Sequence, residues 1–173
     1  MKSILILIVI AAFKLSAQQA QLKTVDFVDL KKYAGLWYEI AKIPNSFQDH
    51  CIKGTTAKYS IKPDGEITVI NSCIDEDGDL DETTGIARVV DKKTNSKLEV
   101  SFVSFLGWRP FWGDYWIIGL DPNYQWAVIG TPKRNYGWIL SRTPKLETNT
   151  LNKIFELLKE KGYDPKDFEM SKQ

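Results

Sequence analysis

Apolar and polar residues alternate in short runs along most of this chain, and a new run begins about every eight to twelve residues. In one such run Leu98, Val100 and Phe102 share a face, and the residues between them are polar. Alternation with a period of two is typical of a β-strand that buries one face. The pattern predicts eight strands, which span residues 36–43, 54–61, 66–73, 84–91, 97–104, 114–121, 126–131 and 137–142.

Turn residues separate these runs. Pro63-Asp64-Gly65 is expected to close the second and third strands as a tight hairpin, and residues 92–96 and 121–124 mark two further turns. A closed barrel suits eight such strands, because closure removes the strand edges that an open sheet would expose. We therefore predict an all-β fold, an eight-stranded antiparallel up-and-down β-barrel.

After the last strand the apolar period changes from two residues to about 3.6. Thr148 or Thr150 is expected to cap the resulting helix, and Gly162 is expected to end it. One amphipathic helix is not stable alone, so we expect it to pack on the outside of the barrel. The alternative is a helix that binds a partner. The apolar stripe consists of Leu151, Ile154, Phe155 and Leu158.

The first 17 residues have the order of a secretory signal: Lys2, an apolar run from Ile4 to Phe13, then Leu15-Ser16-Ala17. This apolar run is too short to span a bilayer, which takes about 20 residues in a helix. We expect cleavage near Ala17, a secreted or periplasmic protein, and a single domain over residues 18–173. The alternatives for residues 1–17 are a short membrane anchor or a buried helix.

Charge excludes one class of partner. The formal net charge is +1, and without Lys2 and Lys14 the chain has 21 basic residues against 22 acidic ones. Nucleic-acid binding needs a basic stripe, which this sequence lacks. We expect no nucleic-acid partner.

Export would permit a disulfide, and Cys51 and Cys73 are the two cysteines of the chain. With a tight turn at Gly65, straight pairing would set Cys73 near Ala57, about 20 Å from Cys51 at ~3.3 Å per residue. A disulfide then requires the loop that carries Cys51 to fold back over the end of the barrel. Free core cysteines are the alternative.

Three stretches resemble known signatures. The first is Gly35-Leu36-Trp37-Tyr38-Glu39-Ile40-Ala41, followed by Ile43-Pro44 and Phe47; the second is Leu120-Asp121 with Tyr124; the third is Trp138-Ile139-Leu140-Ser141-Arg142-Thr143-Pro144. Together they resemble the lipocalin family, and most closely its bacterial outer-membrane and apolipoprotein D group. The similarity runs from about Val25 to Phe168.

The resemblance implies roles for these signature residues. In the family the tryptophan, here Trp37, closes one end of the barrel, and the arginine, here Arg142, lies across it in a cation–π contact. Gly35 would allow close backbone approach, and Asp121 belongs to the second signature. We expect these four residues to be structural.

The resemblance also implies a cavity lined by Tyr59, Asn71, Phe102 and Trp138. Tyr115 and Trp116 are consecutive, so one of them points inward, and the sequence does not say which. An aromatic wall with a few polar groups suits an elongated amphiphile, so we expect a fatty acid or lysophospholipid to be bound, stored or transported, without a cofactor. The alternative is a barrel filled by its own side chains.

The loop after the fifth strand is rich in aromatic residues: Phe105, Trp108, Phe111 and Trp112. Water disfavours such a loop on a monomer's surface. Three interpretations remain open: a lid over the ligand, a contact with a membrane surface or a second copy in a homodimer, and local packing. We expect this end, opposite Trp37, to be the mouth.

Catalysis and metal binding have weak support. His50 is the single histidine, and the acidic run over residues 75–82 lacks the glycine and carboxylate positions of an EF-hand, so we expect a solvated loop with at most weak cation binding and no dedicated metal site. The alternative function is a lipocalin-type enzyme that uses Cys73 as a thiol nucleophile. Gln18 stands where outer-membrane members of the group have a cysteine, so we expect no lipid anchor.

Overall fold

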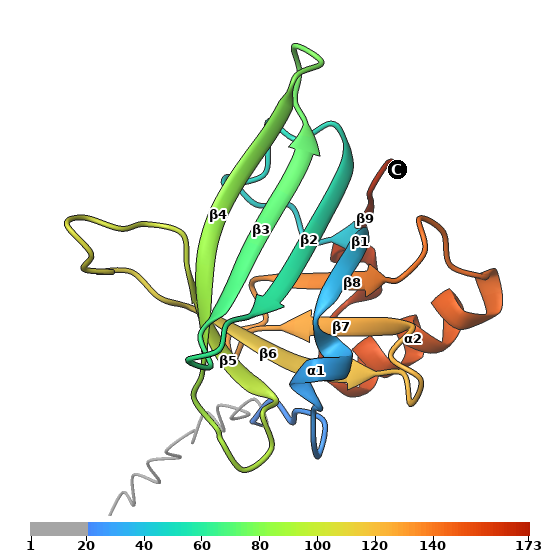
Figure 1. Cartoon of the computed structure of the whole chain (residues 1–173). Coiled ribbons are helices and arrows are strands. Elements are labelled where there is room, and N and C mark those ends of the chain that lie inside the picture. The colour runs from blue at the N-terminus through green and yellow to red at the C-terminus, as the bar shows by residue number, and fades with distance from the viewer. Residues whose placement is uncertain (1–20) are drawn as a thin grey trace, which may run out of the picture.

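The computed structural model describes residues 21–173, which form a closed antiparallel barrel (Figure 1). Each strand from β2 to β7 pairs with the next in chain order, and β1 closes the barrel by pairing with both β8 and β2. This confirms the predicted eight-stranded barrel; the predicted signal segment lies outside the described residues. The barrel strands are β1 (Gly35–Lys42), β2 (Lys53–Ile61), β3 (Ile67–Ile74), β4 (Leu80–Val89), β5 (Lys97–Ser101), β6 (Gly113–Leu120), β7 (Trp126–Gly130) and β8 (Gly137–Ser141).

The hairpin between β2 and β3 is tight, as predicted, but its register differs from the expected one. Ala57 pairs with Asn71 and not with Cys73. The turn is centred on Asp64, with the Lys62 N–H donating to the Glu66 carbonyl at 2.8 Å, and this moves every pair by two residues relative to a turn centred on Gly65. The observed register places Cys73 closer to the loop that carries Cys51.

Two strand ends also differ from the sequence prediction. β4 begins at Leu80, and Asp81 and Glu82 pair with Cys73 and Ser72 of β3. Residues 80–82 of the acidic run are therefore strand, and the solvated loop is shorter than expected. β5 ends at Ser101, three residues before its predicted end.

Helix α2 (Thr148–Glu160) packs on the outer wall of the barrel (Figure 1). Its Ile154 and Leu158 are fully buried in a cluster with outward side chains of the strands, including Val128 and Ile139. The predicted threonine cap is wrong: Glu147 is the N-cap residue, and it makes no side-chain cap bond. No helix among residues 21–173 is long and apolar enough to cross a membrane.

The wall between β1 and β2 has two parts. Residues 35–38 of β1 pair directly with β2, whereas farther along β1 the partner is β9 (Glu169–Met170), which follows the 3₁₀ helix η1 (Pro165–Asp167). Beyond β9, the Lys172 carbonyl accepts from the Gly54 N–H of β2 at 2.7 Å. Residues 169–173 therefore fill the gap where β1 and β2 separate.

Candidate functional site

One end of the barrel is closed by a tryptophan and an arginine. Trp37 is fully buried, and the Arg142 guanidinium carbon lies 3.7 Å from the centre of its ring. The guanidinium also donates to the backbone carbonyls of Leu36 and Lys32, both at 2.7 Å. Gly35 has φ +101°, and a side chain there would meet Arg142. We call this end the floor.

The other element at the floor is helix α1 (Leu30–Tyr33), which lies where β1 begins (Figure 1). The Asp29 carboxylate caps it by accepting from the Lys31 N–H at 2.9 Å. Its last residue, Tyr33, accepts a hydrogen bond from the Trp37 indole through its backbone carbonyl at 2.8 Å. The helix thereby fixes the Tyr33 side chain inside the barrel.

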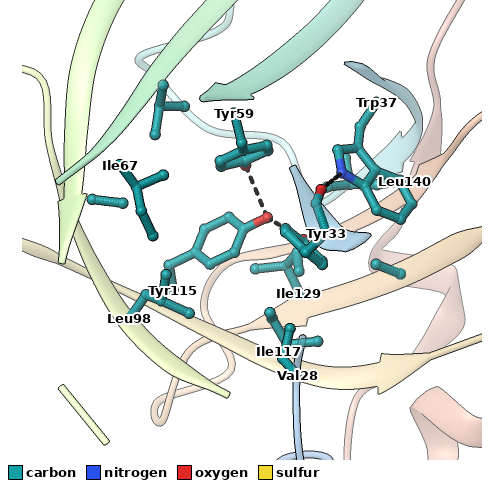
Figure 2. Close-up of a cluster of buried hydrophobic side chains, with 13 residues drawn as sticks. Val28, Tyr33, Trp37, Tyr59, Ile67, Leu98, Tyr115, Ile117, Ile129 and Leu140 are labelled. Carbon is teal, nitrogen blue, oxygen red and sulfur yellow. Dashed lines mark hydrogen bonds between the residues drawn. The ribbon is translucent and has the colours of Figure 1, made fainter. Parts of the chain in front are cut away.

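Three tyrosine hydroxyls meet above this floor (Figure 2). The Tyr59 hydroxyl donates to that of Tyr115 at 2.8 Å, and the hydroxyls of Tyr33 and Tyr115 lie 2.7 Å apart. Burial raises the pKa of all three phenols, so they are neutral near pH 7. Tyr115 is thus the inward member of its pair, while Trp116 lies on the outer wall under Lys97.

We call Tyr33, Tyr59 and Tyr115 the tyrosine trio. The hollow beside it measures about 10 Å³, which is marginal for a single water molecule. The floor half of the barrel is therefore filled by side chains. A larger hollow, about 520 Å³, lies outside the barrel between α2 and η1.

The other predicted lining residues lie elsewhere on the inner wall. Asn71 lies two residues after the inward Val69 of β3, on the same face of the strand, and is partly buried. The Phe102 ring packs against the inner core beside Gly85, where an added Cβ would lie 2.6 Å from the ring. Trp138 also contacts the inner core, on β8. The structure brings Tyr59 and Tyr115 together, and spreads the remaining three around the wall.

A polar cluster near the mouth was missed by sequence analysis. A β-bulge between Glu39 and Ala41 shifts the register of β1, so Lys42 pairs with the inward Trp138. The Lys42 ammonium lies 3.7 Å from the Glu39 carboxylate, which is almost fully buried. Strict alternation would put residues 39 and 42 on opposite faces, and no sequence signal marks the bulge.

Gln48 joins this cluster from the loop between β1 and β2. Its side-chain amide donates to Glu39 at 3.0 Å, and its side-chain oxygen accepts from the Trp138 indole at 3.0 Å. Ser171 adds a hydroxyl bond to Glu39 at 2.7 Å. The buried carboxylate is thus satisfied by a loop and by the segment beyond β9.

Cys51 and Cys73 form the predicted disulfide, with Cα atoms 5.6 Å apart. The bond ties the β1–β2 loop to the inner face of β3, and no free cysteine remains among residues 21–173. His50 lies beside it and bonds Asp81 at 2.9 Å. Because both sulfurs are in the disulfide, Cys73 offers no thiolate for catalysis, and neither cysteine is available as a metal ligand.

The aromatic loop after β5 extends away from the strands in Figure 1 and does not cover the interior. Phe105, Trp108 and Phe111 are exposed, and Leu106 is 93% exposed at the tip. Trp112 differs from its predicted place at the rim, because its ring lies on the outer wall, 3.9 Å from the Arg88 guanidinium. A lid position is therefore not what this structure shows for the loop.

Comparisons with known proteins agree with this architecture. Residues 28–173 match the family model described as a lipocalin-like domain. Temperature-induced lipocalin-1 of Arabidopsis thaliana is 39% identical over 150 residues, covering 85% of this chain and 80% of that protein. Outer membrane lipoprotein Blc of Vibrio cholerae is 38% identical over 144 residues, covering 82% and 81%. Apolipoprotein D of Mus musculus is 35% identical over 143 residues, covering 79% and 72%.

Among solved structures, insecticyanin from the tobacco hornworm Manduca sexta superposes with a TM-score of 0.73 at 24% identity, covering 89% of this chain and 85% of that one. The cockroach allergen Per a 4 gives a TM-score of 0.68 at 23% identity, covering 90% and 95%. At these identities the likeness concerns the fold. The sequence relatives establish the rest: this chain belongs to the lipocalin family, whose members bind small hydrophobic ligands.

Proposed function

We propose that this protein binds and carries a fatty acid or lysophospholipid inside its barrel. The observation that carries the proposal is the combination of a sealed floor with an aromatic inner wall. Trp37 and Arg142 close one end, while Phe102 and Trp138 face inward farther up. A barrel that is closed at one end and lined by aromatic residues suits an elongated apolar molecule that lies along the barrel axis.

Burial of the acyl chain supplies the affinity, at about 0.8 kcal/mol for each CH₂ group removed from water. The floor half is filled, so the chain lies between the tyrosine trio and the mouth. Asn71 and Lys42 offer polar groups on the same inner wall. These groups orient the ligand and add little to its affinity.

The test compares an inner tryptophan with an outer one. Delipidated protein is titrated with palmitate and with lysophosphatidylethanolamine, and binding is followed by calorimetry and native mass spectrometry. Trp138→Ala is expected to weaken binding, whereas Trp116→Ala, on the outer wall, leaves it unchanged. Failure of every lipid to bind the wild type, or equal affinity in both variants, would contradict the proposal.

We also propose that residues 1–17 direct export and that residues 18–173 form the mature domain. Sequencing the amino terminus of the protein recovered from the periplasm or medium tests the cleavage site. An amino terminus before Leu15, or a protein retained inside the cell, would contradict export.

The aromatic loop is proposed as the surface that meets a membrane or a second copy. Leu106 has φ +49° in the two-residue turn between Phe105 and Trp108, a strained conformation that displays its side chain to water. Leu106→Asp should abolish co-sedimentation with phosphatidylcholine vesicles, or concentration-dependent dimerisation, without changing stability. A wild-type protein that shows neither association would contradict this role.

A further inference from the structure

The tyrosine trio holds one more hydroxyl proton than it has hydrogen bonds. Three phenols bring three O–H donors, and the trio makes two hydrogen bonds, both centred on Tyr115. Tyr59 is the donor in one of them, while the bond between Tyr33 and Tyr115 can run either way. Nothing else among residues 21–173 bonds these hydroxyls. One proton is therefore left over, on Tyr33 or on Tyr115.

This surplus donor is buried. Tyr33 is 4% exposed and Tyr115 is 8% exposed, so bulk water does not satisfy it. Apart from the phenols, the adjoining hollow of about 10 Å³ is lined by apolar residues such as Ile67 and Leu98. The phenol groups are therefore the polar partners that the lining offers to a water there, and the volume is marginal for one. A buried donor without an acceptor is a group that a ligand can satisfy.

The surroundings select the acceptor. Burial raises the pKa of the phenols, so the trio offers neutral donors and no charge. A phosphate or an ionised carboxylate needs several donors to leave water, and one hydroxyl does not supply them. A carbonyl oxygen is satisfied by one. The Arg142 guanidinium, close enough to act on the pKa of Tyr33, favours partial negative charge there.

We propose that the tyrosine trio is a subsite for a neutral carbonyl group, of a ketone, an aldehyde or a protonated carboxylic acid, which enters the barrel first. The apolar chain then points toward the mouth. The inference rests on the proposed ligand-binding function and deepens it, because it assigns the ligand's orientation and the chemistry of its leading end. It adds Tyr33, which is not on a barrel strand, to the binding residues.

The experiment uses two probes of the same shape. Decan-2-one carries a carbonyl where 2-methyldec-1-ene carries a terminal methylene, so the pair differs in the acceptor alone. Both are titrated into wild-type protein and into the Tyr33→Phe/Tyr59→Phe/Tyr115→Phe variant. The cost of desolvating the ketone cancels in this comparison. The ratio of ketone to alkene affinity should be on the order of tenfold larger in the wild type, as for one neutral hydrogen bond.

A second readout locates the bond. With ¹³C-labelled carbonyl, the infrared stretch of bound decan-2-one should lie at lower frequency in the wild type than in the triple variant.

Folding is controlled separately. Replacing all members of a hydrogen-bonded group by isosteric apolar residues is close to neutral for stability, so the triple variant should fold. Tyr163→Phe removes a buried hydroxyl outside the barrel interior, where it bonds Thr131, and should leave the affinity ratio unchanged.

The outcomes separate the two proposals. Equal affinity ratios and equal frequencies in wild type and triple variant would overturn the carbonyl subsite while leaving ligand binding intact. Binding of palmitate without binding of decan-2-one would overturn it as well. If palmitate, the ketone and the alkene all fail to bind, both proposals are wrong.

Discussion

The floor and the mouth of this barrel are built in different ways. At the floor, the Arg142 guanidinium stacks on the Trp37 ring, and each of these residues belongs to a short sequence motif. The guanidinium also donates hydrogen bonds to several backbone carbonyls. At the mouth, Glu39 is satisfied by Gln48 and Ser171, which come from a loop and from the segment after β9. The floor depends on β1 and on the segments that precede β1 and follow β8, whereas the mouth depends on the β1–β2 loop and on the segment after β9.

The largest effect is expected at the floor. Arg142→Ala removes the ring contact and leaves several backbone carbonyls without their donor, so the free energy of unfolding should fall by roughly 3–5 kcal/mol. Arg88→Ala is the matched control, because Arg88 also stacks on a tryptophan, Trp112, but at the surface. Its cost should stay below about 1 kcal/mol. Urea denaturation measures both, and equal losses would refute the contrast.

The disulfide is the strongest single element at the mouth. Cys51→Ser/Cys73→Ala opens a loop with a sequence separation of 22, which should lower the free energy of unfolding by about 3 kcal/mol. Thermal melting of the wild type with and without dithiothreitol checks this. The same reductant should leave the double variant unaffected, and any change there would point to another cause.

Alkaline pH is expected to destabilise the floor half of the barrel, because the tyrosine trio lies there. Burial raises the pKa of Tyr59 above the ordinary value of 10.0, so above about pH 10 the unfolded chain loses a proton that the folded protein retains. Stability is complete below that pH and falls as pH rises toward the native pKa, by about 1.4 kcal/mol per pH unit for each such tyrosine. Tyr59→Phe should flatten this decline in urea denaturation between pH 9 and 11; an unchanged slope would contradict it.

The smallest effect is expected from the polar cluster. Gln48→Ala leaves Glu39 and the Trp138 indole each short of one partner, at a cost of about 1–2 kcal/mol. Hydrogen exchange should rise in residues 43–52 and stay constant at the floor. Gln125→Ala, which removes an exposed glutamine, is the control and should change neither quantity. Increased exchange around Trp37 would show that the ends are coupled.

This contrast also explains what the sequence could predict. Alternation and turn residues predicted eight strands, the closed barrel and the outer helix, because period and length are local properties. The contact between Trp37 and Arg142 has a different origin: the resemblance of the signature residues to the lipocalin family implied it. The bulge after Glu39, the inward turn of Gln48 and the partner of Tyr33 depend on how distant segments meet. Alternation along the strand did not decide between Tyr115 and Trp116. It says that consecutive side chains point to opposite faces, but not which of the two faces is the inner one.

The segment that fills the gap between β1 and β2 has a consequence for biosynthesis. Residues 169–173 leave the ribosome after every barrel strand, and β1 must also wait for β8, where Tyr38 pairs with Ser141. Until then the nascent sheet has open edges that invite aggregation. Completion of this barrel therefore waits for the synthesis of β8 and β9, and a chaperone that shields β1 would act at the step where shielding matters most.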